Sequence, residues 1–462
     1  MESFWYLKRL HRVAIKNGEF MLNIQFQPLL DGFNSKQKND LYFLGTFSSD
    51  VEAIDQNNRP KLDLSLVIDR SGSMEGSPLE NIKSAVSHFV DQLQPSDKLS
   101  VIQYDHEADT IYRRSNLNSV PELRLSLSRL RAGGSTDILN GWRKGFHEFP
   151  PTYKDDSIKR IMLFSDGEAN SGATKIGSFA PFIREAADHG ILTSSYGIGH
   201  YFNEQLMAGI AELGGGRSVY GQTASELFNP MIEELDLLKS LVASDLKLKI
   251  KPAKGIFCEV LNPYQSDKKG VFELPSVAAG GETWVLIKVR ADQIGNKQVL
   301  KGEMKIFDIR LKYQDMVSNT SKTIKHPVTI KIVSENQFAK LKENTAVRNR
   351  LNEILISFEQ NRAYQAMERD DWETVNKSLE EIDRLSKDDP WLFESNKVLK
   401  THYRNKNSRA FMKEAHYKSS HLSKRMLPQN SSNIVHNSLS FDDNDDNRFA
   451  SYLRRKKDES RR

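Results

Sequence analysis

The chain has 462 residues, of which 38% are hydrophobic and 27% are charged. A chain of this length can bury several cores, so we expect two to four domains with some polar sequence outside them. The net charge of +5 is small, and acidic and basic residues alternate through most of the chain. This balance gives little reason to expect a nucleic-acid-binding protein.

The single cysteine, Cys258, excludes an internal disulfide framework and any cysteine-rich zinc module, and it favours a reducing compartment. It lies in an apolar run, which predicts a buried strand residue and not a nucleophile. Basic residues interrupt the first twenty positions, so they do not resemble a signal peptide, and no run is long enough for a transmembrane helix. We therefore expect a soluble cytoplasmic protein, with secretion as an effector through a polar C-terminus as the alternative.

In residues 61–240, near-continuous apolar runs alternate with amphipathic segments, which predicts a mainly parallel, Rossmann-like α/β sheet with helices on both faces. Ser77 and Glu80 suggest a capping box around a helix that begins near Pro78 and stops at Gln94-Pro95. Strands are expected at Leu62–Ile68, Leu99–Tyr104, Thr110–Arg113 (an antiparallel edge), Ile158–Phe164, Ile191–Tyr196 and Ser218–Tyr220, and further helices at 120–131, 137–149, 174–189, 203–213 and 225–240.

Residues 241–335 change to a period of two, as in the alternation of leucine and lysine from Leu246 to Lys251, which predicts an antiparallel β domain. The N-terminal segment 1–60 holds two further strand-like runs, Phe20–Phe26 and Leu41–Ser48. Because a lone hairpin is marginal in water, we expect these runs to join the later sheet. The α/β domain would then be inserted in a β-sandwich. The sandwich strands are expected at 246–250, 256–261, 271–274, 283–290, 299–313 and 323–333.

Residues 336–404 return to helical periodicity and predict two or three helices, with a packed hairpin that contains Ala363 and Trp372. From 405 to 462 asparagine, serine, aspartate, lysine and arginine dominate, which predicts a disordered polar tail. The basic positions between 402 and 425 would support at most weak, salt-sensitive association with nucleic acid, without specific recognition.

Hydroxyl and carboxylate side chains follow the ends of two predicted strands. Asp69-Arg70-Ser71-Gly72-Ser73 comes directly after the first strand, and Asp166 follows the fourth. Thr136 lies after a Gly-Gly turn, just before a helix. In a sheet ordered 3-2-1-4-5-6 the first and fourth strands are neighbours, so their carboxyl ends meet at the edge where α/β sheets bind ligands. Oxygen-only ligation suits Mg²⁺, with Ca²⁺ and Mn²⁺ as alternatives, and argues against zinc or copper.

This pattern resembles the von Willebrand factor A (VWA) family with a complete metal-ion-dependent adhesion site. The resemblance covers residues 61–240 and rests on Asp69, Ser71, Ser73, Thr136 and Asp166. It implies that the three hydroxyls ligate the cation directly, while the two aspartates bind it directly or through water. The layout of flanking β-strands and following helices is similar to Ca-activated chloride channel-like and YfbK-like proteins.

Four further residues lie near the predicted site. Arg70 is either an attractant for an acidic partner or a solvated charge at the rim of the site. Asp137 is expected to hold its loop or cap the next helix. Glu168 is the best candidate for a general base but fits a solvated loop residue better, and His106 is expected some distance from the metal.

We expect a protein that binds partners and not an enzyme. Two carboxylates and three neutral hydroxyls leave a divalent cation with an open position, which an acidic side chain of a protein partner can fill. The alternatives are an adaptor or regulatory subunit of an AAA+ ATPase complex and a metal-dependent hydrolase. The chain has no P-loop motif, so any ATPase activity would belong to a partner. The sequence leaves the oligomeric state open.

Overall fold

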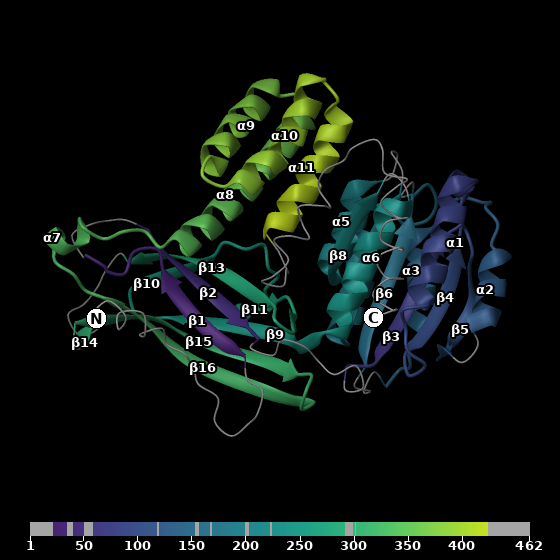
Figure 1. The fold of residues 1–462 in the computed structure, drawn as a ribbon, viewed down its shortest axis with the longest axis horizontal. Helices are drawn as coiled ribbons and strands as arrows, with labels where there is room; N and C mark the ends of the chain where they lie inside the picture. The colour runs from purple at the N-terminus through teal and green to yellow at the C-terminus, as the bar shows by residue number, and fades with distance from the viewer. Residues whose placement is uncertain are drawn as a thin grey trace, which may run out of the picture. The chain divides into compact units, whose positions relative to one another are not determined.

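The computed structural model describes residues 22–34, 40–49, 59–117, 120–152, 157–166, 169–198, 203–221, 224–291, 299–300 and 302–423. These residues divide into two compact units. We call residues 60–239 the α/β unit, and residues 22–59 together with 240–423 the sandwich–helix unit (Figure 1). Within these residues, no helix is long and apolar enough to cross a bilayer.

The α/β unit is built on a six-stranded sheet in the order β5-β4-β3-β6-β7-β8. All neighbours are parallel except β4 and β5, which form an antiparallel edge. Counted along the unit, this is the order 3-2-1-4-5-6, so the prediction from the apolar runs is confirmed. The strands are β3 (Leu62–Asp69), β4 (Lys98–Tyr104), β5 (Ala108–Asn116), β6 (Ile158–Ser165), β7 (Ile191–Ile198) and β8 (Gly215–Gly221).

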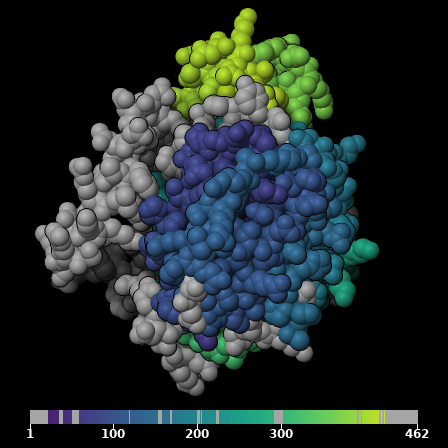
Figure 2. Space-filling model, turned by 90° about the vertical axis from the view of Figure 1, so that its right-hand side faces the viewer, coloured from purple at the N-terminus to yellow at the C-terminus, as the bar shows by residue number. Residues whose placement is uncertain are grey.

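Helices cover both faces of this sheet, and part of their surface is drawn in purple and blue in Figure 2. One layer holds α3 (Ile138–His147), α4 (Ile176–Asp188) and α5 (Glu204–Leu213), and the other holds α1 (Ser77–Val90), α2 (Val120–Ser128) and α6 (Ala224–Lys239). Helix α3 lies close to β3, because a Cβ atom at Gly145 would come within 2.5 Å of Val67 Cγ2. This contact brings the loop before α3 to the end of β3.

The predicted capping box at the start of α1 is wrong. Gly76 is the N-cap residue, Ser77 is the first residue of the helix, and no side chain caps it. Glu80 instead bonds Lys83 Nζ at 2.6 Å. The backbone at this position has a φ of 86°, which disfavours residues with a Cβ atom. Glycine tolerates it because it has none. The helix also ends at Val90, before the predicted stop at Gln94-Pro95.

The sandwich–helix unit contains two antiparallel sheets, ordered β1-β2-β13-β10 and β11-β9-β15, with β16 and β14 pairing β15 and β12 pairing β9. The two N-terminal strands join the sheet of the later β region, as predicted, through the pairing of β2 with β13. In the sequence, the α/β unit is therefore inserted between two segments that form the sandwich. The predicted strand 299–313 is interrupted and forms a hairpin of β14 and β15. The bounds are β1 (Asn23–Pro28), β2 (Leu41–Ser48), β9 (Leu241–Pro252), β10 (Ile256–Val260), β11 (Val271–Leu274), β12 (Val277–Ala278), β13 (Glu282–Ala291), β14 (Val299–Leu300), β15 (Glu303–Asp315) and β16 (Thr320–Lys331).

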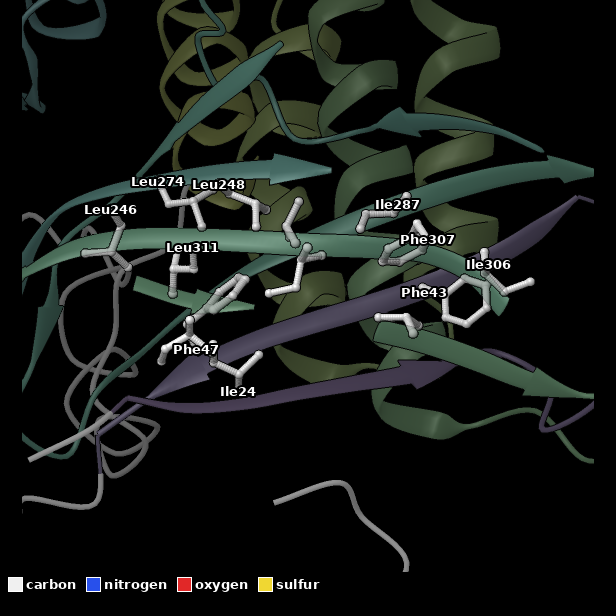
Figure 3. Packing of buried hydrophobic residues seen from close by; sticks show 14 of the residues in the cluster. Ile24, Phe43, Phe47, Leu246, Leu248, Leu274, Ile287, Ile306, Phe307 and Leu311 are labelled. Atoms are coloured by element: carbon white, nitrogen blue, oxygen red, sulfur yellow. The ribbon is translucent and has the colours of Figure 1, made fainter. Parts of the chain in front are cut away.

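Alternating apolar side chains of the two sheets form one core (Figure 3). Phe43 of β2 and Phe307 of β15 are fully buried, with ring centroids 5.7 Å apart. Because side chains alternate along a strand, the intervening polar residues face outward. Cys258 of β10 is only partly buried and packs at the edge of this core, and its burial raises the pKa of the thiol to about 12. Cys258 is thus a strand residue whose thiol ionises poorly, but it is half-buried where the sequence predicted a buried residue.

Five helices follow the sandwich: α7 (Glu335–Phe338), α8 (Thr345–Met367), α9 (Trp372–Ser386), α10 (Pro390–Arg404) and α11 (Ser408–Ser423). The first half of α8 covers the outer face of the β2–β13 sheet, where Val347 and Leu351 pack against Trp284. Arg350 adds a cation–π contact over the Trp284 ring, 4.9 Å from its centroid. Residues of α8 to α11 form a separate core, which includes the predicted hairpin of α8 and α9.

The prediction of a disordered tail from residue 405 is wrong for its first part, because α11 is a helix. Phe411, Ala415 and Leu422 of α11 are buried in the helical core. Lys418 completes the same stripe, 5% exposed, with its Nζ atom 2.9 Å from Glu414. The spacing i, i+4, i+7 and i+11 is that of one helix face. The polar composition of the segment hides this helical spacing in the sequence. Residues 424–462 lie outside the described part of the chain.

Candidate metal site

Asp69 ends β3 with its side chain fully buried. Its Oδ1 atom accepts a hydrogen bond from Ser71 N at 2.8 Å, and its Oδ2 atom accepts from the Ser165 hydroxyl at 2.6 Å and the Tyr104 hydroxyl at 3.4 Å. Burial, with a further contribution from the charge of Asp166, raises the pKa of Asp69 to about 6. Among the described residues, no cationic side chain pairs with this carboxylate to offset its desolvation.

Ser71 and Ser73 come from the short turn that follows β3, a 3₁₀ segment over Gly72–Met74. Their hydroxyl oxygens lie 3.1 Å apart. Ser71 is buried, whereas Ser73 is exposed. The two oxygens are thus close enough to contact one ion, with one of them facing solvent.

Thr136 lies in the loop before α3, and its side chain is fully buried. Within the described residues its hydroxyl has no hydrogen-bond partner. The backbone around it is well anchored, because Thr136 N donates to Asn170 Oδ1 at 2.7 Å and its carbonyl accepts from Ser171 N at 3.1 Å. A buried hydroxyl without a partner is costly. The hydroxyls of Ser65, Thr283 and Ser378 share this property, but the Thr136 loop is bonded to the turn after β3, which makes its hydroxyl the candidate ligand.

Asp166 follows β6 directly, and β6 pairs with β3 in parallel register, Phe164 opposite Ile68. This register places Asp166 beside the end of β3, and its charge acts on both Asp69 and Tyr104. Backbone bonds hold the Thr136 loop against the same end. Gly72 N donates to Gly134 O at 3.1 Å, and Gly133 N donates to Arg70 O at 2.8 Å. The fold therefore gathers all five predicted residues at one edge of the sheet.

Asp105, which the sequence interpretation missed, connects the loops around this edge. It is 2% exposed, its Oδ2 atom lies 2.7 Å from Arg70 Nη2, and its Oδ1 atom accepts from Glu107 N at 2.8 Å. Its carbonyl also accepts from Asp137 N at 2.8 Å. Arg70 is thus an internal ion-pair partner more than a free rim charge. Its position in the sequence could have indicated it, because Asp105 directly follows β4, the strand next to β3.

The other neighbouring residues differ in outcome. Asp137 caps α3, with its Oδ1 atom accepting from Asn140 N at 3.1 Å, as expected. His106 is exposed and its Nδ1 atom lies 3.0 Å from Asp105 Oδ1. Glu168, the candidate base, lies outside the described residues. Ser165 and Tyr104, which hold Asp69, were not recognised from the sequence.

The donor set fits a hard divalent cation. It offers only oxygen atoms, two of them carboxylates, and the unpartnered Thr136 hydroxyl has the buried position that a direct ligand needs. Across the described ranges, no group of three or more His, Cys, Asp or Glu side chains could hold a metal ion. A cage rich in carboxylate, histidine or thiolate ligands is therefore not found there.

Residues 63–233 match the family model of the von Willebrand factor type A domain. These residues form a VWA domain. Domains of this family generally mediate protein–protein interaction, commonly bind a divalent cation, and are typically non-enzymatic.

Three curated relatives match different shares of this chain and of their own length. An uncharacterised protein of Synechocystis sp. is 27% identical over 305 residues, 62% of this chain and 70% of that protein. YfbK of Escherichia coli is 27% identical over 208 residues, 44% of this chain and 36% of YfbK. The mouse inter-alpha-trypsin inhibitor heavy chain 4 is 26% identical over 230 residues, 46% of this chain and 23% of that protein. The chain thus matches only a minor part of the last two.

Solved structures extend the likeness beyond the VWA domain. A von Willebrand factor type A protein from Catenulispora acidiphila has a TM-score of 0.67 at 15% identity, covering 84% of this chain and 92% of its own. An ArnB paralogue from Sulfolobus acidocaldarius has a TM-score of 0.59 at 16% identity, covering 87% and 99%. At these identities the likeness shows the fold alone, which includes antiparallel sheets and helices outside the VWA domain.

For a Mg²⁺ ion held at this candidate site, Asp105→Asn is expected to weaken binding about tenfold, the lower end of the effect of groups that orient metal ligands. The substitution removes the charge that holds Arg70, and with it a tether between the Asp69–Ser73 turn and the next loop. Isothermal titration calorimetry would measure the change. Asp91→Asn, which removes an exposed ion pair with Arg124, is the control and should leave affinity unchanged. Equal affinities of wild type and Asp105→Asn would contradict a positioning role.

Proposed function

We propose that Asp69, Ser71, Ser73, Thr136 and Asp166 hold a divalent cation, with Mg²⁺ as the expected ion, and that this cation binds an acidic side chain of a protein partner. The observation that carries the proposal is the Thr136 hydroxyl, which is fully buried and without a partner within the described residues. Its loop is bonded to the turn that carries the two serines.

The ligand set favours binding over a closed structural role. Two carboxylates balance the charge of one divalent ion, and the three hydroxyls are neutral. An ion so held retains a coordination position that the chain does not fill, and an anionic oxygen from outside is the natural ligand for it. Ser73 is exposed, so the site has a face that a partner can reach.

An adaptor role in an AAA+ ATPase complex would use the same cation and the same kind of acidic contact, so it differs only in the partner. A metal-dependent hydrolase needs in addition a group that takes a proton from water. The Nδ1 atom of His106 lies 3.0 Å from Asp105 Oδ1, so this ring is engaged by another carboxylate. Binding is therefore the function that the described residues support best.

Thr136→Val tests the proposal, because valine keeps the shape of threonine and removes only the hydroxyl. In EDTA the variant should be as stable as wild type or slightly more so, since the buried hydroxyl it removes is unpartnered. In calorimetry its affinity for Mg²⁺ should fall at least tenfold. Ser65→Ala is the matched control. Ser65 is fully buried on β3, but four residues before Asp69.

The partner is tested by affinity capture with the same three proteins, with Mg²⁺ and with EDTA. Wild type and Ser65→Ala should capture the same proteins in Mg²⁺ and lose them in EDTA, and Thr136→Val should fail to capture them in either. If Mg²⁺ affinity falls in Thr136→Val but capture is unchanged, the cation does not bind the partner. If the affinity is unchanged as well, the metal site itself is wrong.

A further inference from the structure

The outer face of the β11-β9-β15-β16 sheet carries a dense group of basic side chains. The register places Lys249 opposite Arg310 and Arg310 opposite Lys325, so three cations form one row across three adjacent strands. The next row pairs Lys247 with Lys312. Lys251 lies one row to the other side. We call Lys247, Lys249, Lys251, Arg310, Lys312 and Lys325 the basic sheet face.

These cations are exposed and mostly not neutralised. All except the half-buried Lys247 are exposed, and Lys247 is the one with a close carboxylate, Asp245 at 2.8 Å. Within the described residues the other five make no ion pair within 4.0 Å, although the nearby Asp267 carboxylate interacts with the charge of Lys249. The two acidic residues in the same rows are Glu273, opposite Lys247, and Asp308, whose carboxylate lies 2.7 Å from Lys305. The face therefore keeps a strong positive excess.

This arrangement costs stability. Like charges directly opposite each other on neighbouring strands repel, and the Lys249–Arg310–Lys325 row has two such pairs. The need to form strands and a core does not require cations in this row. Leu248, Leu311 and Ile324 would fill the core with any polar residues alternating between them. The opposite sheet shows the contrast, since α8 covers its outer face.

The composition of the face selects the kind of partner. Val271, opposite Lys249, is the apolar side chain at these outward strand positions, and no aliphatic side chain larger than valine lies there. The centre of a protein–protein interface, in contrast, is apolar and depleted of lysine. The outward positions also carry no aromatic ring on which a single-stranded base could stack. The cations spread over two dimensions, which matches a planar array of anions better than the curved backbone of a duplex. Lysine, a flexible point charge, suits such a diffuse array.

We propose that the basic sheet face binds the surface of an anionic lipid bilayer. The contact is electrostatic: each cation near the surface strengthens binding about fivefold, and added salt weakens it. It uses residues far in sequence from the candidate metal site and needs no divalent cation.

The test is co-sedimentation of the full chain with vesicles of phosphatidylcholine and phosphatidylserine, in EDTA so that the metal site does not contribute. The test variant combines Lys249→Gln, Arg310→Gln and Lys325→Gln. Its matched control combines Lys377→Gln, Arg384→Gln and Lys397→Gln, two lysines and one arginine on α9 and α10 that form ion pairs with Glu373, Glu381 and Glu394. Both variants change the net charge equally.

Wild type and the control should bind the mixed vesicles, bind pure phosphatidylcholine vesicles much less, and release as salt rises. The test variant should bind about 100-fold more weakly, because three cations are lost. Its melting temperature should not fall, which separates lost binding from lost folding. Equal losses in both variants would show that only net charge matters and would overturn the proposal. Failure of wild type to bind the mixed vesicles would also overturn the proposal. Binding of duplex DNA through the same three residues, without binding of the vesicles, would do the same.

Discussion

Asp69→Asn is expected to make the cation-free protein more stable while removing all stabilisation by Mg²⁺. Asp69 is fully buried, and burial raises the pKa of its carboxyl from 3.8 to about 6. Keeping it ionised above pH 6 therefore costs folding about 1–3 kcal/mol, which asparagine of the same shape avoids. Asparagine still offers an oxygen to Ser71 N, and its amide can donate to the Ser165 hydroxyl.

The pH dependence of stability tests whether the ionised Asp69 carboxylate opposes folding. A carboxyl whose pKa is higher in the folded state binds its proton more tightly there, so its contribution favours folding at low pH. That contribution is complete below about pH 4 and is lost as the pH rises through 6. The stability difference between Asp69→Asn and wild type should thus be largest at pH 7–8, shrink below pH 6, and vanish near pH 4. Hydrogen exchange of β3 and β6 peptides in EDTA would measure it.

Asp63→Asn is the matched control, because Asp63 is also fully buried and lies at the other end of β3. Its carboxylate pairs with Arg114, with Nη2 to Oδ2 at 2.6 Å. Removing this charge should destabilise the VWA domain and leave its stabilisation by Mg²⁺ intact, the opposite of Asp69→Asn on both counts. If Asp69→Asn were less stable than wild type at pH 8 in EDTA, the unpaired carboxylate would not be a cost. If Mg²⁺ still stabilised Asp69→Asn, Asp69 would not be a ligand of the cation.

Glu234→Ala is expected to destabilise the VWA domain by about 3–5 kcal/mol, because it leaves a buried arginine without its carboxylate. Glu234 of α6 is 1% exposed and accepts from the Ser194 hydroxyl at 2.6 Å and the Tyr196 hydroxyl at 2.5 Å. Its Oε1 atom lies 3.4 Å from Nε of Arg160, which is also buried. The carboxylate thus ties α6 to β6 and β7.

Glu233→Ala, one residue earlier, is the control. Glu233 is exposed and lies 3.6 Å from Arg217, so its loss should cost less than about 1 kcal/mol. Hydrogen exchange of β6 and β7 peptides reports on the VWA domain without interference from the sandwich–helix unit. Similar losses for Glu233→Ala and Glu234→Ala would contradict the importance of the buried network.

The α/β sheet could be predicted from the sequence because its strands are short apolar runs bounded by polar turns. β3 illustrates this, because every residue of Leu62–Asp69 is buried and the strand ends at Asp69, a predicted ligand. The end of the helical region could not be predicted in the same way. The buried stripe of α11 includes Lys418, whose charge lowers the apolar signal although its stem packs inside.

The five proposed ligand residues could be named from one-dimensional patterns, but the residues that support them could not. Asp69, Ser71 and Ser73 are adjacent, and Thr136 and Asp166 follow recognisable strand or turn ends. Asp105 and Ser165 show no motif. They matter through contacts with Arg70 and Asp69, which depend on how neighbouring strands are paired.

The sequence alone determined the order of elements in the VWA domain, the five oxygen-bearing positions, and the joining of two N-terminal strands to a later sheet. These follow from local periodicity and strand ends, which neighbouring residues specify. Only the tertiary structure decided that Thr136 is buried without a partner, that Arg70 is bound to Asp105, and that Lys249, Arg310 and Lys325 share one row. Burial, pairing and register join residues distant in the chain, so they depend on the packing of the whole fold.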